Sequence, residues 1–203
     1  MKTKCSSLAV AFATISLAFS APLSSANLEY GGKTYKTVKI GTQTWMAENL
    51  NYETKSSKCY QNNPDNCVKY GHLYDWETAM KICPKGWRLP NNTDWDKLFR
   101  FVDGDIGSKK PYDSPTAGKH LKAASGWNNN GNGTDDYGFS ALPGGWGNSG
   151  GDFDLAGYNG RWWSANIGNS GNAYYRIMSY SNERTYWYSI FKSFLFSVRC
   201  LQD

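Results

Sequence analysis

The sequence is short of the residues from which most metal and catalytic sites are built. Its 203 residues include only two histidines, His72 and His120, and no two cysteines have the Cys-x-x-Cys spacing of many zinc sites. A Ser-His-Asp triad needs a histidine as its base, and no such triad can be recognised around the two that are present. No pair of carboxylates has a spacing that specifies a glycosidase. We therefore expect a protein that is not an enzyme.

Long hydrophobic runs are also missing. The uncharged apolar segment 8–19 is shorter than the roughly 20 residues that span a bilayer. It follows two lysines and precedes Ser24-Ser25-Ala26, so residues 1–26 are predicted to be a signal peptide cleaved near Ala26. The alternative is an uncleaved membrane anchor. We expect a secreted or cell-surface protein whose mature chain, residues 27–203, is one domain without a transmembrane span.

The charge is too mild to indicate a nucleic-acid-binding protein. The formal net charge of +5 falls to +3 without Lys2 and Lys4 of the signal peptide, which holds no acid. Nucleic-acid recognition needs concentrated basic patches, so no nucleic-acid partner is expected. By contrast, aromatic residues are abundant, with 9 Trp, 14 Tyr and 9 Phe beside 21 Gly. This composition favours short strands joined by turns over long helices and argues against disorder.

Four cysteines remain in the mature chain, Cys59, Cys67, Cys83 and Cys200. An even number in an exported chain predicts two disulfides, for which three pairings exist. Cys59 and Cys67 flank the turn-rich segment Tyr-Gln-Asn-Asn-Pro-Asp-Asn, which can fold back on itself, so we pair them and assign Cys83 to Cys200. The alternatives are free thiols or a zinc site.

The pattern along the chain predicts an α+β domain, with helices first and most strands later. Small strands are expected over residues 28–46 and a polar loop over 51–71. A helix capped by Thr93, with Asp96 completing an acidic capping box, would bury one apolar face formed by Trp95, Leu98, Phe99 and Val102. Further helices are predicted over 76–82 (capped by Asp75) and 117–123, a turn at Gly144-Gly145-Trp146, and strands over 161–165, 172–179, 184–188 and 194–200.

Four motifs resemble one known family. They are Cys83-Pro-Lys-Gly-Trp-Arg-Leu-Pro-Asn-Asn-Thr-Asp-Trp, Gly131-Asn-Gly-Thr-Asp-Asp-Tyr-Gly-Phe-Ser-Ala-Leu-Pro-Gly-Gly, Trp162-Trp-Ser and Phe196-Ser-Val-Arg-Cys. From about Lys33 to the C-terminus the chain resembles the Fibrobacter succinogenes major paralogous domain. That family is similar in fold to C-type-lectin-like domains and to formylglycine-generating enzymes.

The resemblance implies a C-type-lectin-like α+β domain with two or three short N-terminal helices and a small antiparallel sheet with long loops. It implies an extracellular or surface module. In that fold a cysteine on an early helix bonds one on the last strand, which agrees with pairing Cys83 to Cys200. The formylglycine-generating relatives use two reactive cysteines near the C-terminus, whereas here Cys200 stands alone. Residues 186–195 are more apolar than the family's pattern at that place.

A calcium site would need converging oxygen ligands. The lectin signatures Glu-Pro-Asn, Gln-Pro-Asp and Trp-Asn-Asp are absent, but Asn128, Asp135 and Asp136 are candidate calcium ligands. The alternative, which the sequence favours, is a polar turn whose side chains cap their own backbone. No other cofactor is expected.

Aromatic side chains provide the candidates for ligand binding, because Trp and Tyr rings stack on sugar rings. The candidates are Trp146, Tyr158, Trp187 and Tyr188, and the alternative is that they build the core of the sheet. The adjacent Trp162-Trp163 pair must point to opposite faces of a strand. The leading hypothesis is an exported non-catalytic binding module, whose partner is a polysaccharide or another surface protein. The alternative is a structural or display protein of the cell surface with no small ligand.

Overall fold

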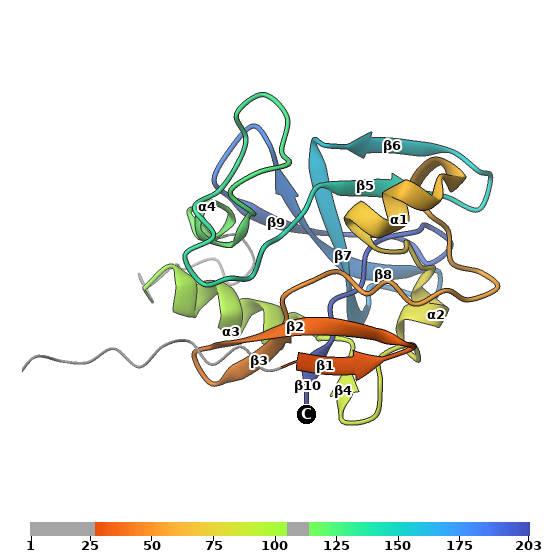
Figure 1. Ribbon diagram of the computed structural model, residues 1–203, viewed down its shortest axis with the longest axis horizontal. Coiled ribbons are helices and arrows are strands. Elements are labelled where there is room, and N and C mark those ends of the chain that lie inside the picture. Colours follow the sequence, from red (N-terminus) through yellow and green to blue (C-terminus); the bar gives the residue numbers. More distant parts are fainter. Residues whose placement is uncertain (1–26, 105–113) are drawn as a thin grey trace, which may run out of the picture.

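The structure, a computed structural model, describes residues 27–104 and 114–203 (Figure 1). The predicted signal peptide lies outside these residues. Within the described residues the chain is mostly β, with two five-stranded sheets and a few short helices. No helix in this part of the chain is both long and apolar enough to cross a bilayer.

The first sheet joins the two ends of the described chain. Gly41, at φ 60°, makes the tight turn between its second and third strands. Leu201 pairs with both Trp45 and Arg88, so the last strand is inserted between an early hairpin and a short middle strand. The order is β1 (Asn27–Tyr30), β2 (Lys33–Ile40), β3 (Gln43–Met46), β10 (Leu201–Gln202) and β4 (Trp87–Arg88), all antiparallel.

The second sheet uses a glycine-rich segment that the sequence predicts to be a turn. Gly145 is indispensable there, because a Cβ atom at this position would lie 2.5 Å from the carbonyl oxygen of Asp154 on the neighbouring strand. The order is β6 (Phe153–Ala156), β5 (Gly144–Gly147), β7 (Asn159–Ile167), β8 (Asn172–Ser179) and β9 (Thr185–Phe191), antiparallel except for the parallel pair β5–β7.

The helices begin at recognisable caps. Asp75 caps α2 through the Thr78 N–H, as predicted. The longest helix begins earlier than predicted, with Asn91 and Asp94 as its capping box, and its predicted apolar face is confirmed as buried. The described helices are η1 (Tyr60–Asn62, a 3-10 turn), α1 (Pro64–Tyr70), α2 (Trp76–Ala79), α3 (Asn92–Val102) and α4 (Ala117–Leu121).

Strand β7 separates the core into two apolar clusters. Trp162 packs into the cluster that contains residues of α3 and α4, and Trp163 packs into the cluster that contains residues of α2. Both rings are fully buried, so the prediction that the adjacent pair points to opposite faces is confirmed. The Trp162 indole donates to Asn49 Oδ1 at 2.9 Å, and the Trp163 indole donates to the Tyr74 carbonyl at 2.7 Å. Each cluster also takes side chains from the first sheet, which unites the two sheets in one body.

The expected C-type-lectin-like α+β fold, with one small sheet, is wrong. The chain forms two sheets of equal strand number. Two strands, β4 and β10, are only two residues long, and β5 is rich in glycine, a residue that disfavours strands. Strands β4 and β10 form by pairing with segments distant in the chain, and β5 forms by pairing with β6 and β7, which follow it closely. The side-chain pattern along the chain does not reveal these pairings.

Both disulfides form as predicted. Cys59 is bonded to Cys67 and Cys83 to Cys200, with Cα–Cα distances of 4.9 Å and 5.8 Å, within the ordinary range for disulfides. Helix α1, which carries Cys67, lies inside the segment predicted to be a loop. Its start has two sequence signals, Asn63 as the N-cap and Pro64 at the first position.

Candidate functional site

Two of the four predicted ligand-binding aromatics are engaged in packing. Trp146, on β5, is half-buried against the Phe194 ring, with a centroid distance of 5.3 Å, and the Arg161 guanidinium lies 5.5 Å from its ring centre. Its indole N–H is buried and has no hydrogen-bond partner among the described residues. Tyr158 is half-buried edge-on against Tyr180 at 5.2 Å. Both rings are therefore partly covered by neighbouring side chains.

The other two predicted aromatics lie side by side on β9. Trp187 is half-buried against Tyr174, at 5.0 Å between centroids, and Tyr188 is 53% exposed beside Tyr175. Consecutive residues of a strand point to opposite faces, so these two rings cannot form one platform. The structure therefore does not bring the four predicted aromatics together.

The predicted calcium ligands bond to separate partners. The Asp135 carboxylate accepts hydrogen bonds from the backbone N–H and the hydroxyl of Ser140, at 2.7 and 2.6 Å. Asp136 lies 2.5 Å from His120 Nδ1, and this hydrogen bond lowers the pKa of the Asp136 carboxyl. The backbone N–H of Asn128 is bonded to the turn before β7. The Asp135 side chain thus caps the backbone of its own turn, which is what the alternative to a calcium site predicts.

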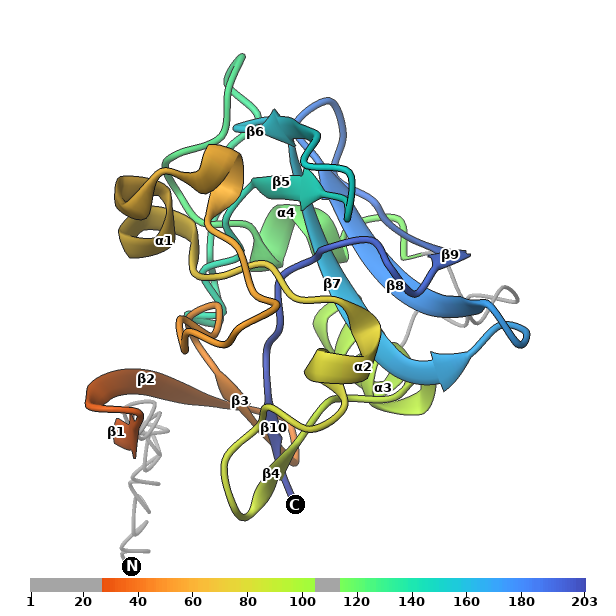
Figure 2. The same cartoon turned by 90° about the vertical axis from the view of Figure 1, so that its right-hand side faces the viewer.

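A groove of about 560 Å³ lies between β2 and α1, and we call it the β2–α1 groove. Helix α1 stands above β2 in both views (Figures 1 and 2). Four segments line the groove: β2, residues 47–51, the end of α1, and the loop 137–142. Its side chains include Lys33, Lys36, Lys69, Glu48, Asn51, Tyr35, Tyr70 and Tyr137.

Polar groups in the β2–α1 groove are held by hydrogen bonds. The Glu48 carboxylate accepts from the Lys36 N–H at 2.9 Å. The Tyr35 hydroxyl oxygen accepts from the Asn51 N–H at 3.2 Å, so its own proton can be donated elsewhere. Burial raises the pKa of Tyr35, which keeps that hydroxyl protonated. The groove therefore offers fixed donors and acceptors together with a surplus of lysine charge.

The end of α1 can approach the floor of the groove because residue 71 is glycine. A Cβ atom at Gly71 would lie 2.7 Å from the carbonyl oxygen of Leu50, and the residue has φ 77°. Beneath this contact, Asn49 Nδ2 donates to the Tyr70 carbonyl at 2.8 Å. Asn49 thus links the helix to the floor.

The opposite wall of the groove is fixed by Arg199, which is fully buried. Its guanidinium donates to the carbonyls of Phe139 and Ser140 and, through Nε, to Asn49 Oδ1 at 3.0 Å. Burial lowers the pKa of Arg199 to about 9, so the group is still charged at neutral pH. Three neutral oxygens solvate this charge, and together they anchor the loop 137–142.

A second groove, of about 590 Å³, lies beside the start of α2, and we call it the α2 groove. Phe153 and Leu195 are its apolar side chains. Lys192 lies 3.5 Å from Glu77 and 4.4 Å from the centre of the Trp76 ring. Its other polar residues include Lys58, Asn62, Asp75 and Asn148, so positive and negative charges balance.

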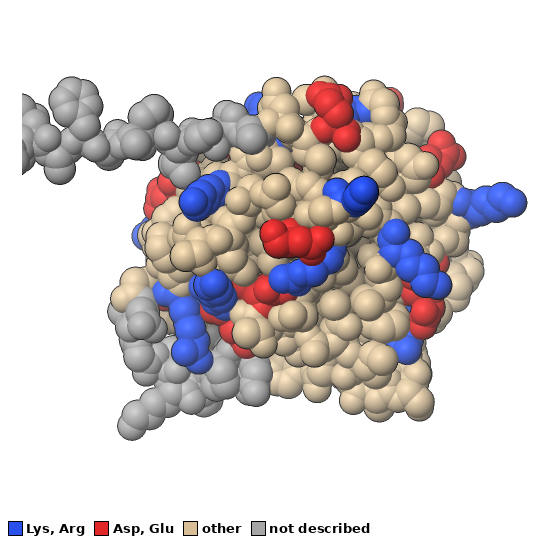
Figure 3. Space-filling view, turned by 90° about the horizontal axis from the view of Figure 1, so that it is seen from below, with Lys and Arg blue, Asp and Glu red and all other residues tan. Residues whose placement is uncertain are grey.

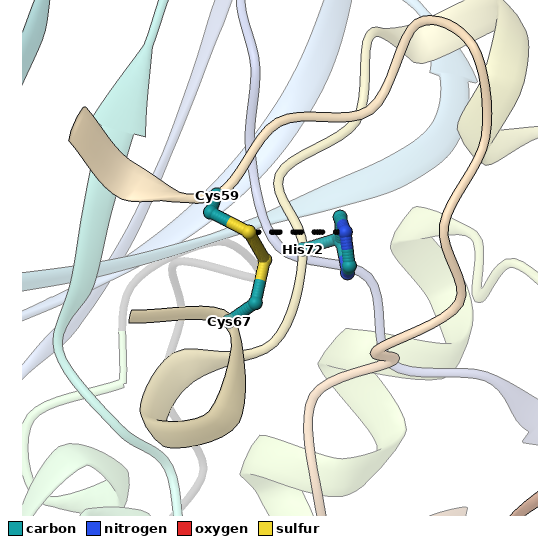
Figure 4. Close-up of side chains that lie close together, drawn as sticks. All are labelled: Cys59, Cys67 and His72. Atoms are coloured by element: carbon teal, nitrogen blue, oxygen red, sulfur yellow. Dashed lines mark hydrogen bonds between the residues drawn. A yellow bond between two sulfur atoms is a disulfide. The ribbon is translucent and has the colours of Figure 1, made fainter. Parts of the chain in front are cut away.

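Sequence reasoning missed both grooves, because each is assembled from segments far apart in the chain. The exposed lysines of β2 and the Tyr137 of the second motif were the available signals for the β2–α1 groove. Neither signal shows, without the fold, which other segments lie opposite these residues to form the groove. Among the described residues, one group of three His, Cys, Asp or Glu side chains is close enough to share a metal ion: Cys59, Cys67 and His72 (Figure 4).

In its described residues the chain is a small disulfide-linked β domain whose surface carries the β2–α1 groove and the α2 groove. The chain belongs to the Fibrobacter succinogenes major domain family, whose model matches residues 38–202, which confirms the resemblance seen in the motifs. No curated protein and no solved structure matches the chain.

Proposed function

We propose that this chain is an exported, non-catalytic binding module that holds a carbohydrate in the β2–α1 groove. The observation that carries this proposal is the groove itself, in which tyrosine, amide, carboxylate and lysine side chains converge on a cavity of about 560 Å³. Small-molecule sites typically have this size and combine apolar walls with a few placed polar groups. The two disulfides support export, since such bonds persist in oxidising compartments.

The chemistry of the groove fits a hydroxylated ring. The half-buried ring of Tyr137 offers an apolar face for the C–H side of a sugar. Glu48 and Tyr35 offer an acceptor and a donor for hydroxyl groups. Three lysines face one glutamate in the lining, so a sugar bearing carboxylates is preferred over a neutral one.

One observation favours binding over catalysis, and a second bears on the class of partner. Glu48 is the one acid that lines the described part of the β2–α1 groove, whereas most glycosidases need two opposed carboxyl groups. On the underside of the molecule, Lys and Arg lie beside Asp and Glu and a broad area carries no charge (Figure 3). That face offers no continuous basic patch for a nucleic acid.

The test is binding of the mature chain to polygalacturonate and to a neutral glucan, by pull-down and calorimetry. Tyr137→Ala and Lys36→Ala should each weaken binding of the acidic polymer about tenfold, the loss of one good contact. Phe153→Ala and Lys58→Ala are the matched controls, an aromatic and a lysine of the α2 groove, and should leave binding unchanged.

Other outcomes would change either the groove to which binding is assigned or the proposed function. Loss of binding only in the two control variants would place the ligand in the α2 groove. Absence of binding to any polysaccharide would favour the display-protein alternative. Thermal unfolding of all four variants distinguishes lost contacts from lost structure.

A further inference from the structure

Cys59, Cys67 and His72 gather three potential metal ligands at one point (Figure 4). Cys59 Sγ lies 3.9 Å from His72 Nε2, and the three donor atoms all lie within 4.8 Å of one another. Two backbone hydrogen bonds between Lys58 and Leu73, of 3.0 and 2.9 Å, hold the two segments together. Their antiparallel bridge places the next residue of one segment, Cys59, opposite the preceding residue of the other, His72.

The histidine is oriented as a ligand. Its Nδ1 lies 2.7 Å from Asn51 Oδ1, an amide oxygen that accepts a hydrogen bond, so Nδ1 carries the hydrogen and the lone pair of the neutral ring is on Nε2, 3.9 Å from Cys59 Sγ. A bond from the second ring nitrogen to an oxygen is the usual support of a zinc-bound histidine.

The distance between Cys59 Sγ and His72 Nε2 fits a zinc ion, and Cys67 Sγ can join them once the disulfide is open. Zinc binds thiolate sulfur at about 2.3 Å and imidazole nitrogen at about 2.0–2.1 Å, so one ion can touch two such atoms when they are less than about 4.4 Å apart. The 3.9 Å separation of Cys59 Sγ and His72 Nε2 meets this limit. We propose that Cys59, Cys67 and His72 form a reduction-dependent zinc site.

The chemistry balances with a dithiol as reductant. A dithiol transfers two electrons and two protons to the Cys59–Cys67 bond and itself becomes a disulfide. The chain then holds two thiols. Zinc displaces their two protons and binds two thiolates and the neutral imidazole, with water at the fourth position.

The scaffold does not depend on the bond that is broken. Helix α1 holds Cys67 through its own hydrogen bonds, with Asn63 as its N-cap and the Gly71 N–H bonded to the Cys67 carbonyl at 3.0 Å. Each disulfide joins a half-buried cysteine, Cys59 or Cys83, to a buried one, Cys67 or Cys200, so exposure alone does not decide which bond a dithiol opens first. When the short disulfide alone is reduced, the backbone that carries the three ligands stays held, and the two sulfur atoms are free to separate and bind the ion.

The experiment measures zinc bound to the mature chain before and after mild anaerobic dithiol treatment. Alkylation and mass spectrometry verify that only Cys59 and Cys67 are reduced. We expect about one zinc ion per reduced chain and none on the oxidised chain. Cobalt substituted for zinc should show thiolate-to-cobalt charge-transfer absorption in the reduced chain alone.

Variants separate this site from adventitious binding. His72→Gln should weaken zinc binding about tenfold or more, and His120→Gln, the matched control, should bind like the unaltered chain. The proposal is overturned by equal zinc binding in both redox states, by unchanged binding in His72→Gln, or by a reduced chain that takes up no zinc. Loss of far-ultraviolet circular dichroism on mild reduction would also overturn it, because the scaffold must persist. None of these outcomes depends on carbohydrate binding.

Discussion

The two disulfides of this domain join very different parts of the structure. Cys83 and Cys200 are 117 residues apart, and their bond ties the segment after α2 to the residue before β10, in the buried core. Cys59 and Cys67 are 8 residues apart, and their bond closes a surface segment beside His72. The chain therefore uses the same covalent bond in a long-range and in a local setting.

The difference between the two settings indicates two roles. The long bond restricts the unfolded chain strongly and fixes the C-terminal strand between β3 and β4. The short bond closes a segment that backbone hydrogen bonds between Lys58 and Leu73 and the capped helix α1 already hold. We infer that the first bond supplies stability and that the second is free to take part in chemistry.

Removal of the long disulfide is expected to have the largest effect. In the chain-entropy model the double variant Cys83→Ala, Cys200→Ala loses about 4–5 kcal/mol of unfolding free energy, since a closed loop of this length restricts the unfolded chain most. Urea denaturation followed by tryptophan fluorescence measures the loss. A loss smaller than that of the short disulfide would contradict the assignment of stability to the long bond.

Removal of the short disulfide is expected to cost less. The double variant Cys59→Ala, Cys67→Ala should lose about 2–3 kcal/mol by the same model. The variant should remain folded, as judged by circular dichroism, because α1 keeps its cap at Asn63. An unfolded variant would show that the short bond is structural, and would remove the basis for its opening under reduction.

The sequence predicted the features that depend on neighbouring residues. The Asp75 cap, the buried face of α3 and the opposite orientation of Trp162 and Trp163 all follow from local periodicity and capping rules, and all are present. The pairing of the cysteines also followed from spacing and turn residues. These features need no knowledge of which distant segments meet.

The features that were missed depend on which segments pair or pack together, and the local residue pattern does not specify this. Leu201 becomes a strand residue only because Trp45 and Arg88 flank it, and the glycine-rich β5 only because β6 and β7 pair with it. The lectin-like fold was therefore the wrong expectation. The same limit applies to the site. Tyr137 and Lys36 line the same groove only in the folded chain, whereas the predicted Trp146 packs against Phe194.

The smallest expected effect is a pH dependence that belongs to the region of the short disulfide. Burial lowers the pKa of His72 in the folded chain below its unfolded value near 6.5, so the unfolded chain binds the proton more readily. The contribution of neutral His72 to stability is therefore complete above the unfolded pKa and declines as the pH falls through it toward the folded pKa.

Urea unfolding of the unaltered chain and of His72→Gln, from about pH 7 to about pH 5, measures this contribution as a difference. That difference should shrink with acidification, since His72→Gln lacks the titrating group. A difference that grows toward pH 5 would mean that the folded chain holds His72 protonated, and a protonated Nε2 could not direct a lone pair at Cys59.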